Sequence, residues 1–316
     1  MATSVPIVRT VTLNPAVDEA IAVERLALGS INRCELDAVD PGGKGINAGR
    51  VIHRLGRPTL LLGFVAGVTG AYLRAALDRE GVPHAFESIA GLTRINVMLL
   101  ERANGRRTRM YLPGASVTAT QLQRLRDALD DAPSGSLVVL GGSLPPGVPG
   151  NFYAATITRL RERGVRCILD TSGTALEQAL PARPLLIKPS LDEAEQVLGR
   201  SLPDTDAVIE AARELQRRGA ENVVISRGES STIALADDGL WEARPPEIAA
   251  CSTVGSGDSM VAGLAIAMNE GMSFPEALRL GTAAGAATAM TTGTQLGDAR
   301  EIERLRELVV ISKRAS

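Results

Sequence analysis

The residues best suited to chemistry lie late in the chain, where the turn Gly255-Ser256-Gly257 is followed by Asp258. The two glycines allow the backbone to turn tightly before a predicted helix, and the first N–H groups of a helix can bind anionic oxygen. A carboxylate at such a site can accept a proton from an attacking hydroxyl group. Considered alone, Asp258 is more simply explained as a helix cap, since Asp is favoured there.

A second glycine-rich segment lies at residues 40–50, where Gly42 and Gly43 precede Lys44 and Asn47. Glycines around a lysine at the start of a helix would bring backbone amides close to a polyhydroxylated ligand. A tight loop that needs positive φ explains the same glycines equally well. Neither segment is one of the better-known nucleotide motifs, since no GxxxxGKS or GxxxxGKT occurs and the late turn lacks the third glycine of GxGxxG.

Alternating strands and helices must position these two segments. Buried strands are predicted at residues 7–13 and 59–65, and a regular alternation follows from residue 136 to residue 226. Runs of βα units at this spacing imply a parallel sheet covered by helices on both faces. The predicted elements of the regular run are strand 136–140, helix 152–163, strand 166–170, helix 174–179, strand 184–188, helices 191–198 and 206–218, and strand 222–226.

Two regions depart from this alternation. Residues 95–112 predict a hairpin that turns at an Asn-Gly dipeptide, and with residues 17–40 it is expected to form a small separate layer. The chain from Gly257 onward is predicted to be mostly helical. We therefore expect residues 1–316 to form a single α/β domain with a minor accessory sheet.

Composition and charge narrow the possible partners. The chain has 316 residues, 45% of them hydrophobic, and its 34 basic and 36 acidic residues give no electrostatic reason to expect nucleic acid or an anionic membrane. Three separated cysteines without a CxxC pair fit a reducing compartment. The N-terminus shows no signal-peptide pattern, and the longest apolar stretch, residues 260–268, is far shorter than the roughly 20 residues of a membrane span. A cytoplasmic enzyme is expected.

The two glycine-rich segments resemble the two signature regions of the PfkB, or ribokinase-like, family of carbohydrate kinases. Their order and the intervening βα pattern agree with that family over nearly the whole chain. Residues 93–96, 112–114 and 142–147 resemble the branch that acts on phosphorylated hexoses, within which the minor-type 6-phosphofructokinases are the most similar group. The resemblance implies a ribokinase-like α/β fold with a β lid formed from about residues 17–40 and 93–113.

The resemblance also implies roles for individual residues. Asp258 would be the catalytic base, and the amides of Gly255, Ser256 and Gly257 would hold the transferred phosphoryl group. Guanidinium groups suit phosphate oxygens, so arginines would surround the phosphate that the substrate already carries. The arginines in question are Arg33, Arg94 and Arg109, and the other implied substrate-binding residues are Asp18, Gly42, Gly43, Lys44, Asn47 and Ser143.

ATP and Mg²⁺ are the implied cofactors, and the resemblance allows a monovalent cation as well. The chain departs from the family where Ser190 replaces an asparagine and where Ser231 replaces a second glycine. Ser190 could still hold a metal-bound water, since Mg²⁺ keeps several waters. The implied cofactor-binding residues are Lys188, Ser190, Ser226 and Gly228, with Glu193 as a metal ligand through water.

These features predict ATP-dependent phosphorylation of fructose 6-phosphate at its 1-hydroxyl group to fructose 1,6-bisphosphate. Residues 109–114 favour this substrate, whereas residues 93–97 fit a 1-phosphofructokinase equally well, and tagatose-6-phosphate kinase is a further alternative. A sugar-phosphate-binding protein with weakened catalysis is the alternative from another class, favoured only by Ser190 and Ser231. A nucleoside kinase fits less well, since aromatic residues make up 3% of the chain. The expected partners are a small sugar phosphate and ATP, and the resemblance implies a homodimer.

Overall fold

The large sheet of the protein carries the strands that position the candidate site. In the computed structural model, which describes residues 6–314, ten strands form this sheet in the order β14-β13-β12-β11-β10-β9-β8-β1-β4-β5. From β11 to β5 all neighbours are parallel, as the βα pattern predicts. The parallel strands are β1 Val8–Thr12, β4 Thr59–Ala66, β5 His84–Ile89, β8 Leu137–Gly141, β9 Arg166–Asp170, β10 Leu186–Ile187 and β11 Asn222–Ile225.

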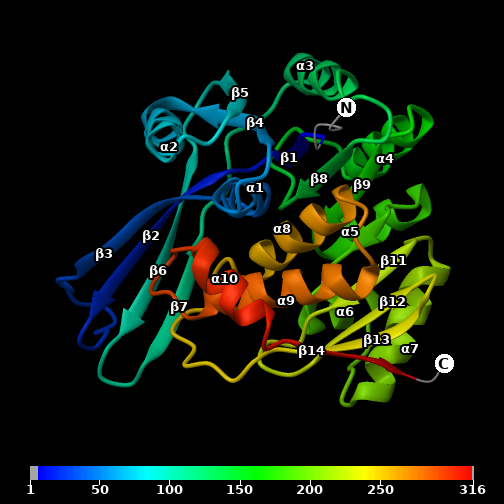
Figure 1. Ribbon diagram of the computed structural model, residues 1–316. Helices are drawn as coiled ribbons and strands as arrows, with labels where there is room; N and C mark the ends of the chain where they lie inside the picture. Colours follow the sequence, from blue (N-terminus) through cyan, green and yellow to red (C-terminus); the bar gives the residue numbers. More distant parts are fainter. Residues whose placement is uncertain (1–5, 315–316) are drawn as a thin grey trace.

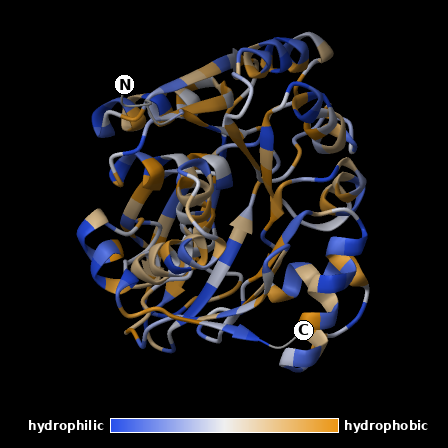
Figure 2. Cartoon of the chain, turned by 45° about the vertical axis from the view of Figure 1, so that its right-hand side comes forward, coloured by the Kyte–Doolittle hydropathy of each residue, from blue (hydrophilic) through white to orange (hydrophobic). Residues whose placement is uncertain are grey.

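Helices cover both faces of the large sheet, which confirms the predicted α/β class (Figure 1). Side chains alternate along β8, so that Val138 and Leu140 join the core on one face while Leu137 and Val139 join the core on the other. In Figure 2 hydrophobic residues occur on both the strands and the helices, interspersed with hydrophilic ones. Within residues 6–314 no helix has the length and apolar character needed to cross a membrane.

The helices divide into two groups by the core that they join. One face of the sheet packs against α3 Ala119–Asp130, α4 Phe152–Glu162, α5 Gly173–Ala179, α6 Leu191–Leu198 and α7 Thr205–Arg217. The other face packs against α1 Lys44–Arg54, α8 Ser256–Asn269, α9 Phe274–Ala289 and α10 Ala299–Arg306. The helix α2 Gly67–Glu80 packs on β4 and β5.

The edge beyond β11 differs from the prediction. Three strands, β12 Thr232–Ala236, β13 Gly239–Arg244 and β14 Val310–Arg314, extend the sheet with antiparallel pairing. The sequence analysis predicted no strand after residue 226 and a mostly helical end. A two-residue connection joins β12 to β13, so the second strand returns antiparallel without a crossover helix. The strand β5 is likewise absent from the predicted elements.

Four further strands form the small sheet, which projects away from the large sheet (Figure 1). Its order is β3-β2-β6-β7, in which β2 and β6 are parallel and both outer pairs are antiparallel. The Asn-Gly dipeptide lies in the turn between β6 and β7, as predicted, and Gly105 has φ 69° there. Every side chain of β7 is exposed. The strands are β2 Ala16–Val23, β3 Glu35–Gly42, β6 Arg94–Glu101 and β7 Arg106–Tyr111.

Candidate active site

A cavity of about 1070 Å³ lies at the carboxyl ends of the parallel strands. Open α/β sheets bind their ligands at this edge. The small sheet forms one wall of the cavity, and the loop that leads into α8 forms another. The residues that follow β1, β8, β9, β10 and β11 in the lining include Asn14, Ser143, Thr171, Lys188 and Ser226.

Asp258 lies in the first turn of α8 and lines this cavity. Asn47 Nδ2 donates a hydrogen bond of 2.8 Å to Asp258 Oδ2, so the two glycine-rich segments meet here. Burial raises the pKa of Asp258 to about 6, assisted by the Asp170 carboxylate, while two nearby lysines and Asn47 act in the opposite direction. Gly255 is the N-cap residue of α8, so Asp258 is the third residue of the helix and not its N-cap. The carboxylate lines the cavity and is available there to accept a proton.

The turn that precedes this carboxylate lines the cavity at the N-terminus of α8. Gly255 has φ 76°, in the left-handed region, and a Cβ atom there would lie 2.7 Å from Leu296 Cδ2. A Cβ atom on Gly257 would lie 3.2 Å from Lys188 Nζ, so that ammonium group is beside the N-terminus of α8. The Ser256 hydroxyl is buried and has no hydrogen-bond partner within residues 6–314. Together these donors suit an anionic phosphoryl group.

Polar side chains of the small sheet and of the β1–β2 connection form one end of the cavity. Asn96 Nδ2 donates to Asp18 Oδ1 at 2.8 Å, and Asn14 Nδ2 donates to Ser143 Oγ at 3.0 Å. Burial raises the pKa of Asp18, although the hydrogen bond from Asn96 opposes this effect. Gly42 does not line the cavity but lies against Asp18, because a Cβ atom on Gly42 would come within 2.0 Å of Asp18 Oδ2. Glycine at this position thus leaves room for the carboxylate.

Two of the three arginines predicted to bind phosphate lie on the cavity wall. Arg94 is half-buried and donates to two backbone carbonyl groups. Arg109 on β7 donates to Thr253 Oγ1 at 3.0 Å and so connects the small sheet to the loop before α8. Arg33 is exposed in the β2–β3 connection, outside the cavity lining. Arg33 precedes the eight-residue strand β3, and Gly42 at the opposite end of that strand lies beside the cavity residue Asp18. The length of the strand therefore keeps Arg33 away from the cavity of its own chain.

Lys44 lines the end of the cavity beside β9 and α6, where it pairs with two carboxylates, although it was predicted among the substrate-binding residues. Its Nζ donates to Asp170 Oδ1 at 2.9 Å and to Glu193 Oε1 at 3.0 Å. Lys188 Nζ lies 3.6 Å from Asp170 Oδ1. Asp170 is thus a site residue that the sequence analysis did not single out. Its signal is an acidic residue at the very end of a buried parallel strand, where ligands bind.

Ser190 is the N-cap residue of α6 in a capping box. Ser190 Oγ accepts from the Glu193 backbone N–H at 3.2 Å, and Glu193 Oε2 accepts from the Ser190 backbone N–H at 2.8 Å. Burial would raise the pKa of Glu193, but the neighbouring lysines and this N–H group hold it below its usual value. Ser226 and Gly228 line the cavity near this end.

The donors at this end fit a Mg²⁺ ion only together with phosphate oxygens. Within residues 6–314 no group of three or more His, Cys, Asp or Glu side chains is arranged to hold a metal ion. Both carboxylate oxygens of Glu193 already accept hydrogen bonds. Mg²⁺ typically uses one or two carboxylates plus substrate phosphates and keeps several waters. A water-mediated contact of Glu193 with a Mg²⁺ ion that arrives with a nucleotide agrees with this geometry.

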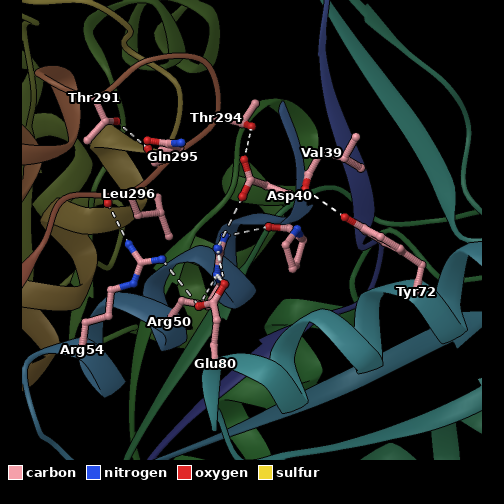
Figure 3. Close-up of polar contacts among 11 residues, drawn as sticks. Val39, Asp40, Arg50, Arg54, Tyr72, Glu80, Thr291, Thr294, Gln295 and Leu296 are labelled. Atoms are coloured by element: carbon pink, nitrogen blue, oxygen red, sulfur yellow. Dashed lines mark hydrogen bonds and ion pairs between the residues drawn. The ribbon is translucent and has the colours of Figure 1, made fainter. Parts of the chain in front are cut away.

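A buried ion cluster behind the cavity attaches the small sheet to the rest of the protein (Figure 3). Arg50 of α1 is 2% exposed, and its Nε lies 3.0 Å from Glu80 Oε2 of α2. Arg50 Nη1 donates to the Pro41 carbonyl oxygen at 3.0 Å, and Nη2 lies 3.7 Å from Asp40 Oδ1. Thr294 Oγ1 donates to Asp40 Oδ2. The end of β3 is therefore fixed to α1, to α2 and to the loop before α10.

Comparison with known proteins identifies the class to which this fold and site belong. The family described as pfkB family carbohydrate kinase matches residues 11–301. The chain therefore belongs to the PfkB family of carbohydrate kinases, which confirms the resemblance of the glycine-rich segments and the ribokinase-like fold.

Individual relatives are phosphofructokinases of two kinds. The 1-phosphofructokinase of Bacillus subtilis is 32% identical over 304 residues, which cover 96% of this chain and 99% of that protein. The ATP-dependent 6-phosphofructokinase isozyme 2 of Escherichia coli is 34% identical over 289 residues, which cover 91% of this chain and 94% of that protein. The crystal structure of phosphofructokinase-2 from Escherichia coli in complex with potassium matches with a TM-score of 0.90 and 33% identity. The match covers 96% of this chain and 99% of that one. The protein is thus a sugar-phosphate kinase of the phosphofructokinase type.

Proposed function

We propose that this kinase transfers the γ-phosphoryl group of ATP to the 1-hydroxyl group of fructose 6-phosphate and so produces fructose 1,6-bisphosphate. The observation that carries the proposal is the location of Arg94 and Arg109 on the wall of the same cavity that Asp258 lines. Guanidinium groups bind phosphate oxygens well. A substrate whose 6-phosphate binds at this wall can turn its opposite end, the 1-hydroxyl group, toward Asp258.

In the proposed reaction Asp258 acts as the general base. It accepts the proton of the 1-hydroxyl group while the oxygen attacks the γ-phosphorus of ATP, whose bond to the bridging oxygen breaks so that ADP leaves. Asn47 keeps the carboxylate oriented through its 2.8 Å hydrogen bond. The N–H groups of residues 255–257 and the Lys188 ammonium group stabilise the charge on the transferred phosphoryl group. Phosphoryl transfer depends mainly on such positioning and electrostatic stabilisation.

The sugar is held by the polar end of the cavity. Its hydroxyl groups exchange hydrogen bonds with Asp18, Asn96 and Ser143, which line this end. Asn96 has an acceptor to offer, because its Oδ1 atom is buried without a partner within residues 6–314. The backbone of Gly43 approaches the sugar closely, because glycine has no side chain to prevent it. The small sheet acts as a lid over this end, which limits the access of water to the phosphoryl group.

ATP occupies the end of the cavity lined by Lys188, Ser190, Ser226 and Gly228. Mg²⁺ neutralises charge on the nucleotide phosphates when it is bound, and Glu193 holds it through water. A monovalent cation is a further proposed cofactor, supported by the potassium complex of the Escherichia coli relative.

Phosphorylation of fructose 1-phosphate is the second candidate, because a 1-phosphofructokinase is among the relatives at comparable identity. The test is ADP release with MgATP against fructose 6-phosphate, fructose 1-phosphate and tagatose 6-phosphate. We expect kcat/KM to be highest for fructose 6-phosphate. Preference for another phosphohexose would overturn the substrate assignment but keep the mechanism. No ADP release with any of the sugars would favour a binding protein with weakened catalysis.

We further propose a homodimer that forms through the outer part of the small sheet. Leu28, Ile31 and Leu36 lie there with exposed fractions of 88%, 93% and 64%. Exposed apolar residues that lie close together are typical of protein interfaces. Light scattering at assay concentration is expected to give twice the chain mass of 33.1 kDa, and a monomer would contradict the proposal. A cytoplasmic location stays a prediction.

A further inference from the structure

The ammonium group of Lys44 occupies the space between two carboxylates from different elements. Lys44 is the first residue of α1, Asp170 is the last residue of β9, and Glu193 lies in the first turn of α6. The distances from Lys44 Nζ are 2.9 Å to Asp170 Oδ1 and 3.0 Å to Glu193 Oε1. These are close to the lengths of charge-assisted hydrogen bonds. A second cation cannot occupy the same position between these two oxygen atoms.

The surroundings keep Lys44 positively charged. Burial alone would lower its pKa, but the carboxylates of Asp170, Glu193 and Asp258 raise the pKa well above its usual value. The side chain of Asp170 is 2% exposed, so solvent screens this interaction little. Lys188 Nζ, 3.6 Å from Asp170 Oδ1, adds a second positive charge. The carboxylate pair is therefore compensated by ammonium groups before any ligand binds.

A divalent cation would use the same pair of carboxylates. Carboxylate oxygens are the protein donors that Mg²⁺ prefers, and one or two of them usually complete a shell of waters and phosphate oxygens. In the nucleotide-free protein such an ion meets the repulsion of two nearby ammonium groups in a partly buried site. Nucleotide phosphates change this balance, because their oxygens accept hydrogen bonds from an ammonium group and also bind the metal.

We propose that Lys44 is the resident cation of the Asp170–Glu193 pair and excludes divalent metal from it until nucleotide phosphates draw the ammonium group away. This inference rests on the proposed function, in which phosphates of ATP bind at this end of the cavity. The metal then enters with the nucleotide and not before it. Lys44 is accordingly a positioning residue that couples metal binding to nucleotide binding.

Binding of Mn²⁺ to the nucleotide-free protein, followed by electron paramagnetic resonance of the free ion, tests this inference. We expect the wild-type protein to bind Mn²⁺ weakly without nucleotide and Lys44→Met to bind it about tenfold more tightly or better, since one adjacent positive charge is removed. Lys313→Met, on the distant strand β14, is the matched control and should bind as weakly as the wild type. Adding Asp170→Asn to Lys44→Met should abolish the gain.

Tight binding of Mn²⁺ by the nucleotide-free wild type would overturn the inference, and this measurement does not depend on the folding of any variant. A folded Lys44→Met protein with no gain in Mn²⁺ affinity would overturn it as well. Sugar phosphorylation is not part of the readout. Failure of the Mn²⁺ experiment in an active kinase therefore rejects only the role of Lys44, whereas absence of ADP release rejects the proposed function.

Discussion

Asp258→Asn is expected to lower kcat by about three orders of magnitude while the protein stays folded, because general-base catalysis typically contributes factors of 10² to 10⁴. Asparagine has nearly the same shape as aspartate but cannot accept the proton of the attacking hydroxyl group. Its side-chain oxygen can still accept the hydrogen bond from Asn47 Nδ2. The measurement is steady-state ADP release at saturating MgATP and sugar phosphate, with circular dichroism to verify the fold.

The pH dependence provides a second readout of the same residue. The pKa of Asp258 is raised to about 6, and a base acts only when it is ionised. We expect kcat of the wild type to rise with pH through about 6 and the residual rate of Asp258→Asn to lack this step.

The same raised pKa has a consequence for stability. Because the pKa of Asp258 is higher in the folded protein than in the unfolded chain, protonation of this carboxyl group favours folding. This contribution is fully present below the pKa of the unfolded chain and is lost as the pH rises through about 6. At pH 7 the buried charge of Asp258 therefore opposes folding, so the Tm of Asp258→Asn should be at least that of the wild type. Near-normal kcat in Asp258→Asn, or a clear loss of Tm, would contradict these roles.

Arg50→Met is expected to lower the free energy of unfolding by about 2–3 kcal/mol. This is less than the roughly 3–5 kcal/mol for breaking a fully buried ion pair, because Glu80 is 27% exposed and keeps Arg54 Nη2 at 3.5 Å. Methionine fills much of the same volume but leaves the carboxylate of Glu80 without its closest guanidinium partner. The Pro41 carbonyl oxygen also loses a donor. Urea unfolding of the two proteins at neutral pH measures the difference.

Arg102→Met is the matched control for this prediction. Arg102 also pairs with two carboxylates, those of Glu35 and Asp37, but its side chain is 48% exposed. Exposed ion pairs contribute about 0–1 kcal/mol, so this variant should unfold at nearly the wild-type urea concentration. An equal decrease in the free energy of unfolding of Arg50→Met and Arg102→Met would show that burial does not determine the contribution of Arg50 to stability.

Much of the fold could be predicted because its signals are local. The parallel strands are short apolar runs between helices, and the turn at Gly255 precedes a helix in sequence as in structure. The strand β14 was not predicted, although residues 308–311 are all apolar, because this run is short, directly follows a helix and ends in polar residues that are exposed or half-buried. Its place in the sheet depends on pairing with β13, which lies far away in the sequence.

The site shows the same division between local and distant information. The resemblance implied that Asn47 and Asp258 belong to one site, but it did not predict the hydrogen bond between them, which joins residues far apart in the sequence. The position of Lys44 between Asp170 and Glu193 joins residues 126 and 149 positions apart, and neither local sequence indicates it. The location of Arg33 depends on the direction and length of β3, which only the pairing of the small sheet defines.

The fixed end of β3 gives the β2–β3 hairpin the mechanics of a cantilever. Asp40 and Pro41 are fastened to α1, α2 and the loop before α10, whereas Leu28 and Ile31 in the β2–β3 connection are 88% and 93% exposed. A beam held at one end moves most at its tip and least near its support. Asp18 pairs with Asp40 in register at that support. A load on the β2–β3 connection would therefore bend the outer part of this hairpin and leave the Asp18 carboxylate in the cavity almost stationary.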